Sequence, residues 1–299
     1  MKRGLDWRDL QYFLAVARGG SLSVAGRQLG VDHATVGRHI QSLEQAMDAS
    51  LFERHLRGYA MTRQGERLLA AVEGMDKEAG RITETSEGGL SGTIRISALE
   101  GFANFFLAPR IGLLLANNPG LTVEMETIQQ IVSLARRHAD IAITLTPPNS
   151  TRFVGEELGE YSLFVYASPA YLARHAPIHT REDLAEHMFA GYVDELLFTR
   201  ELDYQGAMGI PARAVRVQNS SIHAQMEAAC SGLCLAVLPA FVAATRPQLV
   251  RVLPETMTLR RLYWLVTRAD ERGTRRIHHL CALLRREVEK EKALFLGET

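Results

Sequence analysis

The chain is poor in cysteine. Its 299 residues include three cysteines, at positions 230, 234 and 281, which are too few for a framework of disulfide bonds. Cys230 and Cys234 lie four residues apart in an apolar segment, so we expect buried thiols, because free cysteine is among the most buried residue types. A redox pair is the alternative. No group of histidines and cysteines has the spacing of a zinc site, so we expect no metal and no cofactor.

Long apolar runs and a signal peptide are also missing. The longest apolar candidate, residues 234–244, is interrupted by Pro239 and is shorter than the roughly 20 residues that span a bilayer. The charged N-terminus, residues 1–7, lacks the apolar stretch of a secretory signal. The sequence therefore predicts a cytoplasmic protein without a membrane partner.

The motifs of common enzymes are absent as well. We find no Gly-x-Ser-x-Gly elbow, no Walker loop and no Gly-x-Gly-x-x-Gly. Hydrophobic residues make up 46% of the chain and charged residues 23%, which is ordinary for a globular protein, and the length suggests about two domains. We expect a protein that is not an enzyme; an enzyme built on the C-terminal part is the alternative.

The charges are unevenly distributed along the chain. The formal net charge is zero, but residues 1–63 hold nine basic and six acidic side chains. A small basic module on a slightly acidic body is consistent with binding to nucleic acid.

The first fifty residues show the pattern of a helix-turn-helix. Apolar residues recur at helical spacing over residues 7–18, and a Gly-Gly pair ends this first helix. Ser21 is a suitable N-cap for a second helix, which Gly30 breaks, and Asp32 is a suitable N-cap for a third. A short helix, a tight turn and a second amphipathic helix make up this motif.

The outer face of the third helix carries polar and basic side chains, among them His39. We expect this helix to enter the major groove of double-stranded DNA. His33 and Thr35 would meet bases or phosphates, and Arg38 would read guanine through a bidentate contact. The alternative is that these side chains are merely exposed.

Residues 51–62 predict a wing. Two short extended pieces flank a basic turn that ends in Gly58. Such a hairpin would lay Arg54 and Arg57 along the phosphates, where contacts orient the module and carry little sequence information.

A heptad stripe follows the wing. Thr62 is a suitable cap for a helix from residue 63 to about 87, in which apolar residues are spaced four and three apart: Leu68, Val72, Met75, Ala79 and Ile82. Such a stripe favours pairing with the same helix of a second chain, so we expect a homodimer or homotetramer. A helix packed on its own domain is the alternative. Residues 86–92 have the composition of a hinge.

From residue 93 onward, strand and helix signals alternate, which predicts an α/β region with mainly parallel sheets. Strands are expected at 93–97, 121–126, 140–144, 161–167, 214–217, 235–238 and 262–267. Helices are expected at 105–117, 132–137, 221–230 and 275–292.

Two strand-to-helix junctions have the composition of a ligand site. Ser97 and Glu100 lie at the first junction, and Ser220 and Ser221 at the second. Ligands bind beyond the carboxyl ends of strands in α/β sheets, and hydroxyls and N–H groups at helix N-termini bind anions. We therefore expect both junctions to face one cleft that binds a small-molecule effector. For the two serines, capping of their own helix is the alternative.

Two threonines extend the expected effector site, and Glu100 limits the kind of effector that it would bind. Thr127 and Thr144 also follow strands and would line the same cleft. Glu100 argues against a carboxylate effector, because its own charge would repel one and already satisfies the helix dipole. A cationic, zwitterionic or neutral effector remains open.

In its N-terminal motifs the chain resembles the LysR-type transcriptional regulator family. The matching runs are residues 9–17, 20–25, 29–31, 51–54 and 62–65. Over nearly the whole chain, the resemblance implies an α/β fold with an N-terminal all-α winged helix-turn-helix, a linker helix that pairs two chains, and a two-subdomain effector domain like periplasmic solute-binding proteins. Gly37 departs from the family, which usually has a serine there that contacts DNA.

The resemblance also implies domain borders and a function. Residues 1–63 would form the DNA-binding domain and 64–90 the linker helix and hinge. Residues 91–299 would bind the effector, with subdomain I at 91–161 and 268–299 and subdomain II at 162–267. The implied function is sequence-specific regulation of transcription in response to an effector bound between the subdomains. A stand-alone solute-binding protein is the alternative, against which the basic recognition helix and the missing signal peptide argue.

Overall fold

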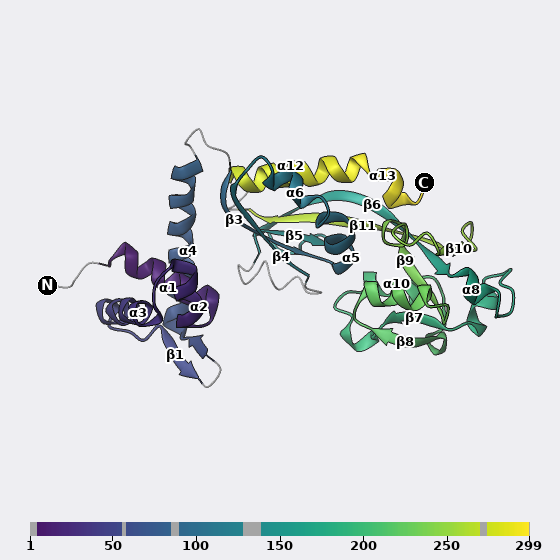
Figure 1. Cartoon of the computed structure of the whole chain (residues 1–299), viewed down its shortest axis with the longest axis horizontal. Helices are drawn as coiled ribbons and strands as arrows, with labels where there is room; N and C mark the ends of the chain where they lie inside the picture. Colours follow the sequence, from purple (N-terminus) through teal and green to yellow (C-terminus); the bar gives the residue numbers. More distant parts are fainter. Residues whose placement is uncertain (1–4, 56–57, 85–89, 128–138, 270–273, 299) are drawn as a thin grey trace. The chain divides into compact units, whose positions relative to one another are not determined.

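Figure 1 shows the computed structural model of the chain, which describes residues 5–55, 58–84, 90–127, 139–269 and 274–298, with the backbone alone for 54, 55, 58 and 76–84. The chain divides into two compact units, Met1–Glu87 and Gly88–Thr299. By this division, the helix that follows the wing belongs to the first unit.

The first unit consists of three helices, a two-stranded hairpin and a fourth helix. The elements are α1 (Trp7–Gly19), α2 (Leu22–Leu29), α3 (His33–Met47), β1 (Phe52–His55), β2 (Gly58–Met61) and α4 (Arg63–Glu84). The strands β1 and β2 pair antiparallel from Phe52↔Met61 to His55↔Gly58. The expected helices and the two extended pieces of the wing are therefore confirmed.

Local capping explains where these helices begin and end. The Ser21 hydroxyl accepts the Val24 N–H at 3.2 Å, and an Asp32 carboxylate oxygen accepts the Thr35 N–H at 2.6 Å. Each bond satisfies one of the free N–H groups at a helix start. Gly20 closes α1 in the left-handed conformation, with φ of 67°, which glycine adopts without steric cost.

A single apolar cluster holds the first unit together. It joins one face of α1 and α3 to the hairpin and to the start of α4, and Phe13, Val36, Leu43 and Leu51 are fully buried in it. Periodicity along each helix predicted this burial, because residues three and four apart share a helix face.

Part of the stripe on α4 that was expected to contact a second chain is buried within its own unit. Val72 is 1% exposed and belongs to the apolar cluster of its own unit, and Leu68 is partly buried against the same cluster. These two side chains are thus used within the chain, as the alternative interpretation held. Met75 is 46% exposed, while the side chains of Ala79 and Ile82 lie outside the described residues.

The second unit is a mixed α/β structure. Its strands are β3 (Ser91–Ala98), β4 (Gly120–Glu126), β5 (Ile141–Thr144), β6 (Phe153–Ala167), β7 (Phe189–Tyr192), β8 (Val215–Asn219), β9 (Leu235–Pro239), β10 (Val250–Val252) and β11 (Thr258–Arg268). Its α-helices are α5 (Glu100–Phe102), α6 (Ile111–Leu115), α8 (Pro169–Leu172), α9 (Tyr204–Ala207), α10 (Ile222–Cys230), α11 (Ala240–Ala243), α12 (Arg275–Lys290) and α13 (Lys292–Leu296).

The strands form one sheet in the order β4-β3-β5-β11-β6-β9-β7-β8, with β10 beside β6. Two groups, β4-β3-β5 and β9-β7-β8, are parallel, whereas β11 pairs antiparallel with both β5 and β6, and β6 pairs antiparallel with β9. The expectation of mainly parallel sheets therefore holds for the two outer groups but not for the centre. In Figure 1, α12 lies along β6, and α10 lies beside the second parallel group.

The two central strands are longer than expected, and the expected subdomain borders fall within them. β6 begins at Phe153 rather than at residue 161, and β11 begins at Thr258 rather than at 262. The last part of β11, from Trp264 to Thr267, pairs with β5 in the first parallel group. The expected border at residue 267 therefore falls within β11, which also pairs with β6 along its whole length, and it stays a prediction.

The helix expected at residues 105–117 begins earlier and is interrupted. α5 starts at Glu100 and continues as a π-helical stretch, Ala103–Leu107, before α6. The segment expected at 132–137 lies outside the described residues, as does most of the hinge at 86–92. None of the helices within the described ranges is both long and apolar enough to cross a bilayer.

Two glycines of α4 should respond oppositely to an added methyl group. A Cβ at Gly65 would overlap the Leu51 carbonyl oxygen, so we expect Gly65→Ala to destabilise the first unit by about 1–3 kcal/mol. Gly74 has open space around its Cβ position, so Gly74→Ala should stabilise by up to about 1 kcal/mol through helix propensity. Urea unfolding of the full-length chain, followed by circular dichroism, measures both changes, and shifts of the same sign would contradict the packing of α4.

Candidate DNA-binding and effector sites

The start of α3 presents the residues expected to contact DNA. His33 and Arg38 are exposed, and Thr35 is half-buried. The Thr35 hydroxyl donates to an Asp32 carboxylate oxygen at 3.0 Å and accepts from the Arg38 guanidinium at 3.0 Å. These bonds from the Thr35 N–H and hydroxyl lower the pKa of Asp32. The hydrogen bond to the Thr35 hydroxyl holds the guanidinium of Arg38 over the first turn of the helix.

His39 does not belong to the free outer face on which the sequence placed it. Its Nδ1 lies 2.6 Å from an Asp9 carboxylate oxygen, and its ring stacks on Tyr12 at 3.9 Å between centroids, with an interplanar angle of 5°. Asp9 is 6% exposed. His39 therefore ties α3 to α1, a contact that depends on how two helices cross and leaves no signal in local sequence.

Gly37 is not required by packing. A Cβ at this position would meet the Leu22 side chain at 3.5 Å, an ordinary van der Waals distance. The missing serine hydroxyl is thus a difference in chemistry and not a response to crowding.

The strands β1 and β2 form the hairpin expected for the wing. Its pairing ends at His55↔Gly58. Arg57 and the side chain of Arg54 lie outside the described residues, and their expected contacts with phosphate stay predictions.

In the second unit, three expected effector residues lie at the same end of three parallel strands. β3 runs parallel to both β4 and β5, so Ser97, Thr127 and Thr144 all lie at or just beyond carboxyl ends. Ser97 and Thr144 are buried, with 4% and 6% exposed, while Thr127 is exposed. The Thr144 hydroxyl donates to the Thr146 carbonyl at 2.7 Å.

The structure brings the two strand-to-helix junctions into contact. The Ser221 hydroxyl donates to Oε1 of Glu100 at 2.7 Å, and the Ile222 N–H donates to Oε2 at 2.8 Å. Ser221 also caps α10, since its hydroxyl accepts the Ala224 N–H at 3.1 Å, as the alternative held. Ser220 is exposed beside it.

Sequence reasoning missed a group of tyrosines around the paired strands β6 and β11. Tyr161 and Tyr263 stack with centroids 4.3 Å apart, and the hydroxyls of Tyr161 and Tyr204 lie 3.4 Å from each other. Burial raises the pKa of Tyr204 to about 12 and holds those of Tyr161 and Tyr263 well above their usual value. Burial, nearby Tyr204 and Glu100 likewise raise the pKa of Tyr192. The four phenols stay neutral and come from separate segments, so no spacing pattern marks them.

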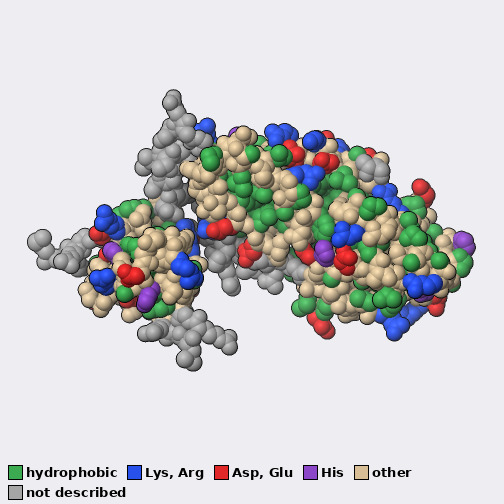
Figure 2. All heavy atoms as spheres, viewed as in Figure 1, with side chains coloured by type: hydrophobic (Ala, Val, Ile, Leu, Met, Phe, Trp, Pro, Cys, Tyr) green, Lys and Arg blue, Asp and Glu red, His purple; other side chains and the backbone are tan. Residues whose placement is uncertain are grey.

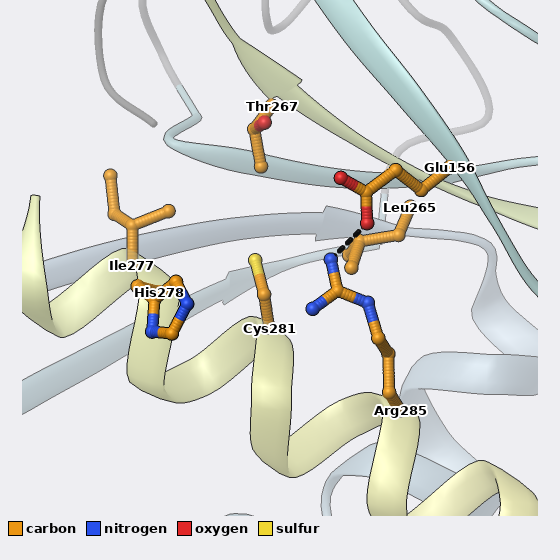
Figure 3. A pocket seen from close by; sticks show the side chains of 7 residues that line it. All are labelled: Glu156, Leu265, Thr267, Ile277, His278, Cys281 and Arg285. Atoms are coloured by element: carbon orange, nitrogen blue, oxygen red, sulfur yellow. Dashed lines mark hydrogen bonds and ion pairs between the residues drawn. The ribbon is translucent and has the colours of Figure 1, made fainter. Parts of the chain in front are cut away.

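A separate cavity of about 310 Å³ lies between α12 and the central strands. Figure 3 shows Arg285 of α12 pointing toward Glu156 of β6, with which it forms an ion pair, while Cys281 and His278 face the same space. Because the two charged groups satisfy each other, the cavity offers a ligand no unpaired charge from this pair.

The cysteines are free thiols, and none forms a disulfide. Cys234 and Cys281 are buried, and burial raises the pKa of each to about 11. Burial also raises the pKa of Cys230. Thiols are poor nucleophiles when protonated, which argues against a redox pair. Among the described residues, no three metal-ligating side chains lie close enough to hold an ion.

The surface of the second unit carries charges of both signs. On the face drawn in Figure 2, acidic and basic side chains are intermixed over this unit. This arrangement offers no broad single-sign field on that face.

A winged helix-turn-helix, followed by an α/β unit in which two parallel groups flank an antiparallel pair of central strands, defines the class of two-part DNA-binding regulators. Comparison with known families agrees. Residues 7–66 match the bacterial regulatory helix-turn-helix protein of the lysR family, and residues 87–289 match the LysR substrate binding domain. The chain belongs to the LysR family of transcription regulators, which bind DNA and carry an effector-binding domain, and it is not an enzyme.

Individual relatives support this assignment. The chain is 30% identical over 285 residues to the Mau operon transcriptional activator of Paracoccus denitrificans, covering 93% of this chain and 96% of that protein. Two solved structures share the fold. A probable transcriptional regulator of Pseudomonas aeruginosa gives a TM-score of 0.69 at 20% identity, covering 96% and 97% of the two chains. ArgP of Mycobacterium tuberculosis gives 0.65 at 21% identity, covering 95% and 97%.

The raised thiol pKa values lead to a test of cysteine reactivity. In a Cys230→Ser variant, we expect native Cys234 and Cys281 to react with a disulfide reagent at pH 8 about 100-fold more slowly than in the urea-unfolded chain, because the thiolate is the nucleophile. The rate in the native protein should rise as the pH approaches 11. Stopped-flow absorbance measures it, and rapid native labelling at pH 8 would contradict the buried, protonated thiols.

Proposed function

We propose that this regulator reads DNA mainly through the first turns of α3 and that the wing fixes its position on the phosphates. The observation that carries the proposal is the hydrogen bond between Thr35 and Arg38. It restrains the guanidinium before DNA arrives, so that less side-chain freedom is lost on forming a bidentate contact with guanine. His33 contacts bases or phosphates beside it. Arg54 and Arg57 contact the phosphates from the wing.

We further propose that two or four copies of the chain act together. The exposed Met75 on α4, followed by Ala79 and Ile82 at heptad spacing, supports a helix pair between two chains. Leu68 and Val72 support the same helix from within each chain. A symmetric pair of modules reads a DNA site with two-fold symmetry, in the cytoplasm where the chromosome is accessible.

The effector site lies between the two groups of strands. Ser97, Thr127 and Thr144 serve it from the first group, and Ser220 and Ser221 from the second. A small molecule that prefers one arrangement of the two groups shifts the population toward it, and only differential affinity produces that shift. The new arrangement repositions the DNA-binding modules through residues 64–90, which connect the module at 1–63 to the effector domain at 91–299.

Substitution of two arginines separates base reading from phosphate contact. Arg38→Ala should weaken binding to the operator by about 5- to 150-fold, the equivalent of one guanine contact, and relax specificity. Arg57→Ala should weaken operator and random DNA alike and reduce the slope against salt concentration by about one. Fluorescence anisotropy with the DNA upstream of the chain's own gene, at two salt concentrations and with random competitor, measures both.

Arg213→Ala is the matched control for that experiment. Arg213 is an exposed arginine of the second unit, so its removal changes the net charge without touching the recognition helix. If Arg38→Ala behaves as Arg213→Ala or as Arg57→Ala on both kinds of DNA, the assignment of base reading to Arg38 is wrong.

Ser97 provides a test of the effector site. We expect Ser97→Ala to leave the affinity for operator DNA unchanged but to impair the response to a compound that alters that affinity, found by screening in the same anisotropy assay. The hydroxyl is buried at the end of β3 and far in sequence from the DNA-binding module. A full response in the variant would remove Ser97 from the site.

A further inference from the structure

Glu100 makes a contact that the family assignment does not explain. It is the first residue of α5, which follows β3 of the first group, and its carboxylate reaches the start of α10 in the second group. Both carboxylate oxygens are engaged, one by the Ser221 hydroxyl and one by the Ile222 N–H. A single side chain thus bridges two parts of the fold that are 121 residues apart in sequence.

The start of α10 has the chemistry of a carboxylate site. Helix N-termini carry partial positive charge and free N–H groups. Here the Ser221 hydroxyl already accepts the Ala224 N–H, so its own proton points outward and requires an acceptor. The Ile222 N–H lies beside it as a second donor. Two donors at this spacing suit the two oxygens of one carboxylate, and the carboxylate that accepts both hydrogen bonds is that of Glu100.

Packing around the bridge shows that it is a built contact. A Cβ at Gly101 would lie 3.5 Å from Ile222 and 3.6 Å from Val242, so the backbone of α5 lies close to both α10 and α11. Phe105, in the π-helical stretch after α5, stacks on the His223 ring with centroids 5.7 Å apart and an interplanar angle of 26°. The carboxylate of Glu100 therefore lies at the edge of a packed contact of α5 with α10 and α11, which we call the joint.

We propose that Glu100 acts as an internal carboxylate that takes the place of an anionic effector group at the start of α10. The proposal rests on the proposed function, since it concerns the same cleft. It assigns the class of effector: a molecule that presents no negative charge to this end of the cleft, whether neutral or cationic. A carboxylate ligand would have to displace Glu100 from both donors and remain next to its charge.

Removal of the internal carboxylate should create a site for a free one. We expect Glu100→Ala to lower the thermal unfolding midpoint of the second unit by about 2–4 °C, the shift typical of one lost interaction in a unit of this size. Sodium formate should then raise that midpoint in Glu100→Ala more than sodium chloride of the same ionic strength does. The wild type should show no difference between the two salts. Differential scanning calorimetry of the full-length chain measures each case.

Three further variants sharpen the result. Glu126→Ala, an exposed carboxylate at the end of β4, is the matched control and should gain no response to formate. Adding Ser221→Ala to Glu100→Ala removes one donor and should weaken the rescue. Glu100→Gln keeps the size of the side chain but presents an NH₂ group to a donor, so its midpoint should fall between those of the wild type and Glu100→Ala.

The outcomes that would overturn the proposal are distinct. One is a formate effect of equal size in the wild type and in Glu100→Ala; another is a Glu100→Gln midpoint equal to that of the wild type. The second criterion holds even if Glu100→Ala fails to fold. Because the readout contains no DNA, a failure here concerns Glu100 alone, whereas loss of operator binding in the anisotropy experiment concerns the proposed function.

Discussion

The antiparallel pairing of β6 with β11 is the constraint on which the second unit depends. The ladder runs from Phe153↔Arg268 to Phe164↔Thr258 and is interrupted by a single irregularity beside Tyr263. One end of β11 also pairs with β5, and one end of β6 pairs with β9, so each end of the ladder belongs to a different parallel group. The ladder therefore links the two groups, and α5 and α10, which are remote in sequence, meet through Glu100 and Ser221.

The same ladder limits how the two groups move. Separating β6 from β11 would leave a row of backbone donors and acceptors without partners, which costs too much to serve as a switch. Motion is therefore restricted to twisting and bending of the paired strands, which is easiest at an irregularity, where the ladder is already disrupted. The stacked rings of Tyr161 and Tyr263 lie at this point. The helix α5, which begins with Glu100, packs against the same point, since the rings of Phe102 and Tyr263 have centroids 5.0 Å apart.

Elements governed by neighbouring residues were predictable from the sequence. The caps at Ser21 and Asp32 and the apolar faces of α1 and α3 depend on positions within a few residues of each other. Contacts set by three-dimensional crossing were not predictable: His39 on Asp9, Val72 in the core of its own unit, and the tyrosines of the ladder. For the effector site, strand ends indicated which residues would gather at one edge, but nothing local showed that Glu100 would bind Ser221. The antiparallel pairing of the central strands was not predicted for the same reason, because the direction in which strands pair depends on partners that are remote in sequence.

The bridge has a thermodynamic consequence for any effector. An effector changes the population of two arrangements only by the difference of its affinities for them, and Glu100 already stabilises the arrangement in which α5 and α10 touch. A molecule that binds best to that same arrangement has little population left to shift, whereas one that binds best when the joint is rotated must overcome the two hydrogen bonds of Glu100. Under the proposed role of Glu100, an effective ligand would enter the space between α5 and α10 and donate hydrogen bonds to the Glu100 carboxylate, rather than accept the hydrogen bonds that Ser221 and Ile222 give. An uncharged or cationic group does this, and an anion does not.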